Sequence, residues 1–108
     1  MNEWNIINSA RISHILNATK ECYNLYEKEG IKYLKLDIAD EDSKRISKYF
    51  KTAYEFIDNA LEEQPTNSVL VHCAQGKSRS ATIVIMFLMK KMCWPYEKVI
   101  DGLLKLTW

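Results

Sequence analysis

The chain has 108 residues, and its 47% hydrophobic and 27% charged residues are typical of an ordinary soluble domain. This length fits one domain with one core, which we place at residues 1–108. Fifteen basic residues against fourteen acidic ones give a formal net charge of +1, so no overall field attracts nucleic acid or an anionic membrane. Recognition of an anion must therefore be local.

The cysteines and histidines do not form a pattern typical of a disulfide framework or a metal site. Cys22, Cys73 and Cys93 are an odd number without zinc-site spacing, and His14 and His72 are not a ligand-like pair. We therefore expect free thiols, no metal, and a reducing compartment, either cytosol or nucleus.

Membrane association is not expected. The start, MNEWNIINSA, lacks the basic region and apolar run of a signal peptide. The longest apolar stretch, 81–89, falls far short of the roughly 20 residues that a transmembrane helix needs.

The first half of the chain predicts two strands and a helix. Residues 11–17 place Ile12 and Ile15 among polar residues, and residues 31–38 alternate between apolar and polar side chains. Apolar residues then recur at three- and four-residue steps over 43–64, which indicates an amphipathic helix that Pro65 ends.

The second half predicts a strand followed by two helices. The nearly continuous apolar run at 68–72 is typical of a strand buried on both faces. A helix should follow over 79–92, with a break at Trp94 and Pro95, and another should run from 96 to the chain end. Strands alternating with helices predict an α/β domain with a mainly parallel central sheet.

The segment from Val71 to Ser80, VHCAQGKSRS, joins a predicted strand to a predicted helix. Such a turn presents unpaired backbone N–H groups at the positive end of the helix dipole, which makes it an anion site. Gly76 permits the tight curl that a loop around an anion requires. The expected phosphate-binding residues are Ala74, Gln75, Gly76, Lys77, Ser78 and Arg79.

A cysteine at the mouth of this loop adds chemistry to the anion site. Helix N-termini and nearby cations favour the thiolate, the reactive form of cysteine, so Cys73 is the predicted nucleophile. Arg79 can grip two phosphate oxygens and neutralise charge during transfer. Ser80 can donate its hydroxyl to the sulfur and improve the thiolate as a leaving group. His72 can orient the loop, although it could also simply pack at the strand end.

Cys73 to Arg79 is Cys-x5-Arg, and the longer stretch His-Cys-x-x-Gly-x-Ser-Arg-Ser resembles the signature of the dual-specificity protein phosphatases. The segments RISHILN, IKYLKLDIAD, YFKTAYEFIDNAL and SATIVIMFLM are similar in kind and order to elements of that family. The resemblance implies the cysteine-phosphatase fold, with four to five sheet strands flanked by helices and an apparent shortening at both ends.

The resemblance also implies a general acid, an Asp on a loop about thirty residues before the cysteine. The segment LDIADEDS offers three candidates. We favour Asp40, because it follows the predicted strand directly. Asp42 is an alternative that could instead cap the next helix, and Asp37 belongs to the strand.

The predicted activity is therefore hydrolysis of phosphotyrosine, phosphoserine or phosphothreonine in proteins through a phosphocysteine, without metal or organic cofactor. The alternative is a catalytically silent module that binds phosphoproteins. Oxidation of Cys73, with Cys22 or Cys93 as resolving thiol, is a further hypothesis for regulation. We expect a monomer, with dimerisation through uncovered edges as the alternative.

Overall fold

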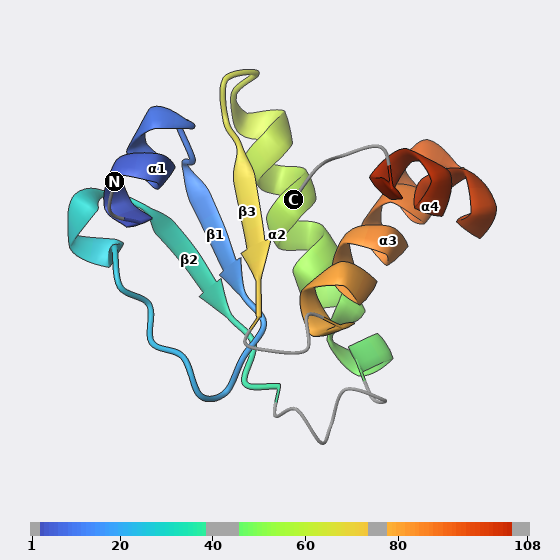
Figure 1. Cartoon of the computed structure of the whole chain (residues 1–108), viewed down its shortest axis with the longest axis horizontal. Helices are drawn as coiled ribbons and strands as arrows, with labels where there is room; N and C mark the ends of the chain where they lie inside the picture. Colours follow the sequence, from blue (N-terminus) through green and yellow to red (C-terminus); the bar gives the residue numbers. More distant parts are fainter. Residues whose placement is uncertain (1–2, 39–45, 74–77, 105–108) are drawn as a thin grey trace.

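The computed structural model describes residues 3–38, 46–73 and 78–104. Strands β1 (His14–Asn17), β2 (Lys32–Lys35) and β3 (Val69–His72) form a parallel sheet in the order β2-β1-β3. All three strands point toward the same edge of the sheet (Figure 1). The predicted α/β class and parallel sheet are confirmed.

Within the described ranges the sheet has three strands, fewer than the four to five that the resemblance implied. The segment ahead of β1 forms the short helix α1 (Glu3–Ser9). The described strands are also shorter than the predicted apolar segments.

The central strand is β1, because it lies between the other two and all four of its residues are buried. Leu16 is in register with Leu34 and Val71 of the neighbouring strands. The expectation that β3 is buried on both faces is wrong, since its Leu70 is 36% exposed. In the described part of the chain, β3 pairs with β1 alone, so it has less cover than the central strand.

Each face of the sheet carries its own apolar cluster. The larger one joins the sheet to the helices at residues 50–63 and 78–92. Its buried members are Leu16, Ala18, Leu36, Ile38, Ile46, Ala53, Ile57, Ile83 and Phe87. The smaller one lies against α1 and contains Ile7, Ile15 and Ile31. Burial of these groups is the main favourable term in folding.

Three helices follow the predicted pattern. After one 3₁₀ turn at 46–49, α2 (Phe50–Glu63) buries Ala53, Ile57 and Ala60, as its periodicity predicted. Helix α3 (Ser78–Met92) begins one residue before the predicted start. The expected break follows it, with Cys93 at a φ of 55° before α4 (Tyr96–Leu104). Among the described helices, none combines the length and apolar character that crossing a bilayer requires.

An ion-pair cluster between two helices and a short 3₁₀ helix are further parts of the fold. Lys91 of α3 forms ion pairs with Asp58 and Glu62 of α2, at 2.7 and 3.0 Å, which link the two helices. A short 3₁₀ helix, η1 (Glu27–Glu29), precedes β2 and ends at Gly30, whose φ of 90° suits glycine.

Candidate active site

Cys73 directly follows the last residue of β3, at the carboxyl edge of the parallel sheet. Its side chain is half-buried and packs against the larger apolar cluster. Helix α3 begins five residues later, so Arg79 and Ser80 belong to its first turn. The positive end of the helix dipole therefore lies beside these residues.

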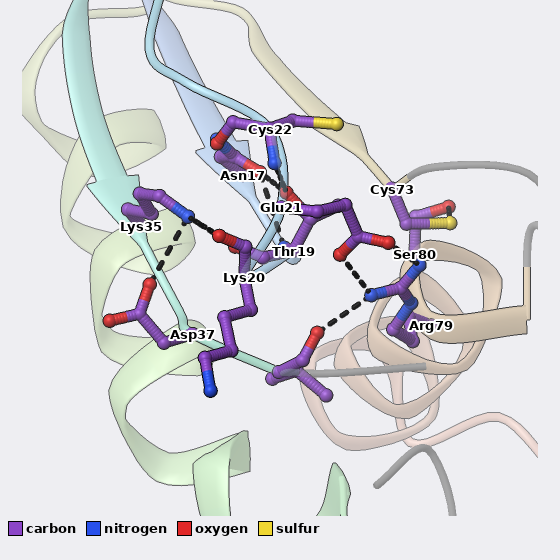
Figure 2. A network of polar contacts seen from close by, with 11 residues as sticks. Asn17, Thr19, Lys20, Glu21, Cys22, Lys35, Asp37, Cys73, Arg79 and Ser80 are labelled. Carbon is purple, nitrogen blue, oxygen red and sulfur yellow. Dashed lines mark hydrogen bonds and ion pairs between the residues drawn. The ribbon is translucent and has the colours of Figure 1, made fainter. Parts of the chain in front are cut away.

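Ser80 lies in hydrogen-bond contact with Cys73. The distance between Ser80 Oγ and Cys73 Sγ is 3.2 Å, and either atom can be the donor. When Cys73 is a thiolate, the hydroxyl must donate, because the thiolate has no proton. Figure 2 shows the two residues side by side with Arg79; the role predicted for Ser80 depends on this contact.

Arg79 is among the most deeply buried side chains in the described structure, with 1% of its side chain exposed. Its Nη1 donates to the main-chain carbonyl of Ile38 at 2.6 Å and to Glu21 Oε1 at 3.0 Å. Nη2 donates to Glu21 Oε2 at 3.3 Å. These contacts hold the buried guanidinium in one plane, and Figure 2 shows it beside Ser80 and Cys73.

Glu21 was missed by sequence reasoning. It lies 58 residues before Arg79, in the loop after β1, and one sequence offers no signal that separates it from nearby Glu27 or Glu29. Hydrogen bonds, first of all from Arg79, lower the pKa of Glu21 to about 2, so its carboxylate is ionised at neutral pH.

Asn17, the last residue of β1, hydrogen-bonds through its side chain to the loop that follows the strand. Its Nδ2 donates to the carbonyl of Cys22 at 2.9 Å, and its Oδ1 accepts from Thr19. The connection to β3 is made by Ala18, whose N–H donates to the carbonyl of His72 at 2.9 Å. Asn17 thus shapes the loop that carries Glu21.

The His72 ring lines a cavity of about 600 Å³ on the α1 side of the sheet, together with Glu3, Tyr33 and Leu70. Burial, with a smaller effect from Lys35, lowers the pKa of His72, while Glu3 opposes this change. The neutral imidazole is therefore the form present at pH 7. His72 therefore adds no positive charge beside Cys73 at this pH.

The predicted general acid lies outside the described residues, as do Asp42 and the loop residues Ala74, Gln75, Gly76 and Lys77; the side chain of Ser78 is not described either. Of the three candidates only Asp37 can be placed. Its side chain is 69% exposed, pairs with Lys35 at 3.1 Å, and in Figure 2 points away from Cys73 and Arg79. This placement does not suit an acid that protonates a leaving group at Cys73.

The remaining histidine and cysteines of the described residues are His14, Cys22 and Cys93. His14 is buried, contacts Ser13 Oγ through Nδ1 at 2.8 Å and packs edge-on against Phe56, which agrees with a structural role. Cys22 and Cys93 are free thiols, half-buried and exposed respectively. No cluster of three metal-binding side chains occurs within residues 3–38, 46–73 and 78–104.

Comparison with known proteins identifies the family. Residues 3–105 match the family model described as "Dual specificity phosphatase, catalytic domain". A Slingshot homolog protein phosphatase from Xenopus laevis is 38% identical over 103 residues, which are 91% of this chain and 14% of the relative. Human dual specificity protein phosphatase 26 is 44% identical over 82 residues, which are 72% of this chain and 38% of that protein. The chain thus spans well under half the length of these relatives.

Solved structures agree with the sequence matches. The crystal structure of DUSP15 superposes with a TM-score of 0.81 at 26% identity, over 94% of this chain and 62% of that one. The human tyrosine phosphatase-like serine/threonine/tyrosine-interacting protein gives a TM-score of 0.74 at 30% identity, over 90% and 66% of the two chains. The family match and the placement of Cys73, Arg79 and Ser80 agree, and the chain belongs to the dual specificity phosphatase catalytic-domain family.

Proposed function

We propose that this chain is a dual-specificity protein phosphatase domain, spanning residues 1–108, that uses Cys73 as its nucleophile. The observation that carries the proposal is the 3.2 Å contact between Cys73 and Ser80 at the start of α3, beside the buried Arg79. A thiol, a hydroxyl donor and a guanidinium meet where a helix dipole favours negative charge.

The reaction has two steps. In the first, Cys73 Sγ forms a bond to phosphorus while the bond from phosphorus to the substrate oxygen breaks, and Arg79 balances charge on the transferring group. The departing oxygen takes a proton from a general acid. In the second, water attacks phosphorus, the P–S bond breaks, and inorganic phosphate and the Cys73 thiolate are released.

Asp40 is the residue to which we assign the acid, because it follows β2 by five residues, whereas the exposed Asp37 pairs with Lys35. The same carboxylate, deprotonated after the first step, would accept a proton from the attacking water. Asp42 is the alternative for this role. Such acid–base catalysis contributes about 10²–10⁴-fold.

Phosphorylated proteins are the substrates that family membership favours, with both phosphotyrosine and phosphoserine or phosphothreonine accepted. No metal or cofactor takes part in the proposed steps. We place the active protein in the cytosol or nucleus as a monomer; its described cysteines are free thiols, as a reducing compartment would keep them.

The test is hydrolysis of para-nitrophenyl phosphate from pH 4.5 to 8, in EDTA, by the wild type, Cys73→Ser and Asp40→Asn. We expect no activity from Cys73→Ser and a loss of about 10²-fold or more from Asp40→Asn at its optimum. An unaffected Asp40→Asn would transfer the acid to Asp42. A folded wild type that binds phosphopeptides without turnover would replace the enzyme with the silent binding module.

A further inference from the structure

We propose that Glu21 is a positioning residue, which holds the Arg79 guanidinium in the orientation that the transition state requires. The proposal rests on the proposed phosphatase function and adds a residue to its machinery. In this proposal the loop 18–24 serves to place Glu21 next to the start of α3.

The geometry at Arg79 supports this role. Glu21 accepts from both terminal nitrogens, and the carbonyl of Ile38 accepts from Nη1 as well. Three hydrogen bonds from two separate segments define the plane of the guanidinium as well as its position. Both Glu21 contacts use the end of the guanidinium that carries Nη1 and Nη2, so one carboxylate fixes both terminal nitrogens.

The Arg79 and Glu21 side chains differ in exposure, as expected when one positions the other. The Arg79 side chain is 1% exposed, whereas the Glu21 side chain is 49% exposed. Burial of an unpaired guanidinium would be costly, so Arg79 needs a counter-charge even when no phosphate is bound. Glu21 supplies that charge from the solvent side, and its carboxylate is ionised over the whole neutral range.

The backbone around Glu21 is held from two sides by buried polar groups. Asn17 and Thr19 are fully buried, and Thr19 Oγ1 donates to Asn17 Oδ1 at 2.6 Å and accepts from the Cys22 N–H at 3.0 Å. Lys35 Nζ donates to the carbonyls of Thr19 and Lys20, at 2.5 and 3.2 Å. Figure 2 shows this network leading from β2 through the loop to Arg79.

The charge of Glu21 predicts how catalysis responds to its loss. A carboxylate beside the site repels the substrate dianion in the ground state and in the transition state alike, so removing it favours binding. Removing it also releases the Arg79 plane, which costs most where the transferring group has its most demanding geometry. The lost repulsion and the lost orientation change KM in opposite directions, whereas the lost orientation alone lowers kcat.

The first experiment compares Glu21→Gln with Glu55→Gln, a matched charge change on the exposed side of α2. For Glu21→Gln we expect kcat on para-nitrophenyl phosphate to fall by about 10-fold and KM to change by less than about 3-fold. Vanadate, which imitates the five-coordinate phosphorus, should bind about 10-fold more weakly, and inorganic phosphate about as well as before. Glu55→Gln should match the wild type in all four values.

A second experiment tests whether the loop acts through Glu21. Thr19→Val keeps the shape of the side chain and removes its two hydrogen bonds. We expect it to lower kcat by about 3- to 10-fold in the wild type and by less than about 2-fold in the Glu21→Gln background, since coupled residues are not additive. Full additivity would show that Thr19 does not act through Glu21 and would overturn that part of the proposal.

Three outcomes decide the rest. A folded Glu21→Gln with kcat and vanadate affinity within 2-fold of the wild type overturns the positioning role, while the phosphatase function stands. A wild type without turnover whose vanadate binding still depends on Glu21 removes the phosphatase function and keeps the positioning of Arg79. If Glu21→Gln fails to fold, Glu21→Asp answers instead: one methylene shorter, it cannot keep both contacts, and an unchanged kcat would again overturn the proposal.

Discussion

Replacing Ser80 with alanine should separate the two chemical steps. The hydroxyl of Ser80 is 3.2 Å from Cys73 Sγ, close enough to donate to the thiolate that leaves phosphorus in the second step. A hydrogen bond to a charged group contributes about 1.5–3 kcal/mol. If the full contribution is realised when the thiolate departs, the second step slows by about 10- to 150-fold.

The first step should be slowed less, because the thiolate begins it already formed and loses charge as it attacks. The phosphocysteine should therefore accumulate in Ser80→Ala. Stopped-flow release of para-nitrophenol would show a burst approaching one equivalent per active site, followed by the slow steady state. Trapping in acid and mass spectrometry would place the added phosphate on Cys73.

Ser80→Thr is the matched control, since it keeps the hydroxyl and should turn over within a few-fold of the wild type. The reasoning fails if Ser80→Ala shows no burst and a kcat within 2-fold of the wild type, because the contact would then have no influence on the leaving group. A burst with unchanged steady-state rate would be equally contrary, since accumulation requires a slower second step.

Three further results are expected. Ile83→Ala removes a fully buried side chain from the larger core cluster and should lower the free energy of unfolding in urea by about 2–5 kcal/mol, with the exposed Ala81→Ser as a near-neutral control. Burial lowers the pKa of both His14 and His72, so their contribution to stability is present above the ordinary histidine pKa and is lost as pH falls below it. The midpoint of urea unfolding should therefore drop between pH 7 and pH 5, and it should drop less in a His14→Gln variant. The pKa of Glu21 is about 2, so the Glu21–Arg79 pair stays intact above pH 4.5, and Glu21→Gln should lower the pH–rate profile without moving its acid limb.

The fold was largely accessible from sequence because its signals are local. Hydrophobic periodicity in α2, the strand–loop–helix arrangement around Cys73 and the stop at Pro95 each depend on a few neighbouring residues. The wrong expectation concerns how deeply β3 is buried, which depends on neighbours that are remote in the sequence. A mostly apolar segment such as 69–72 has the same sequence pattern at the edge of a sheet as at its centre, and the order of the described strands is what places β1 between the other two.

In the candidate site, too, the residues close together in the sequence were predictable and the remote ones were not. Cys73, Arg79 and Ser80 lie within eight residues, so the motif that contains them could be recognised in the sequence. His72 was expected either to orient the loop or to pack at the strand end; its carbonyl accepts from the Ala18 N–H, and its ring lines the cavity on the α1 side of the sheet.

The sequence by itself therefore predicted the nucleophile and the phosphate-binding segment and carried the family resemblance, because a loop that wraps one anion is built from consecutive residues. Only the tertiary structure brought Glu21 and the Ile38 carbonyl to Arg79. Parallel strands end at one edge of the sheet, so loops that are remote in sequence meet there. Desolvation then requires a buried guanidinium to find partners among them, and which residues serve is decided by that meeting.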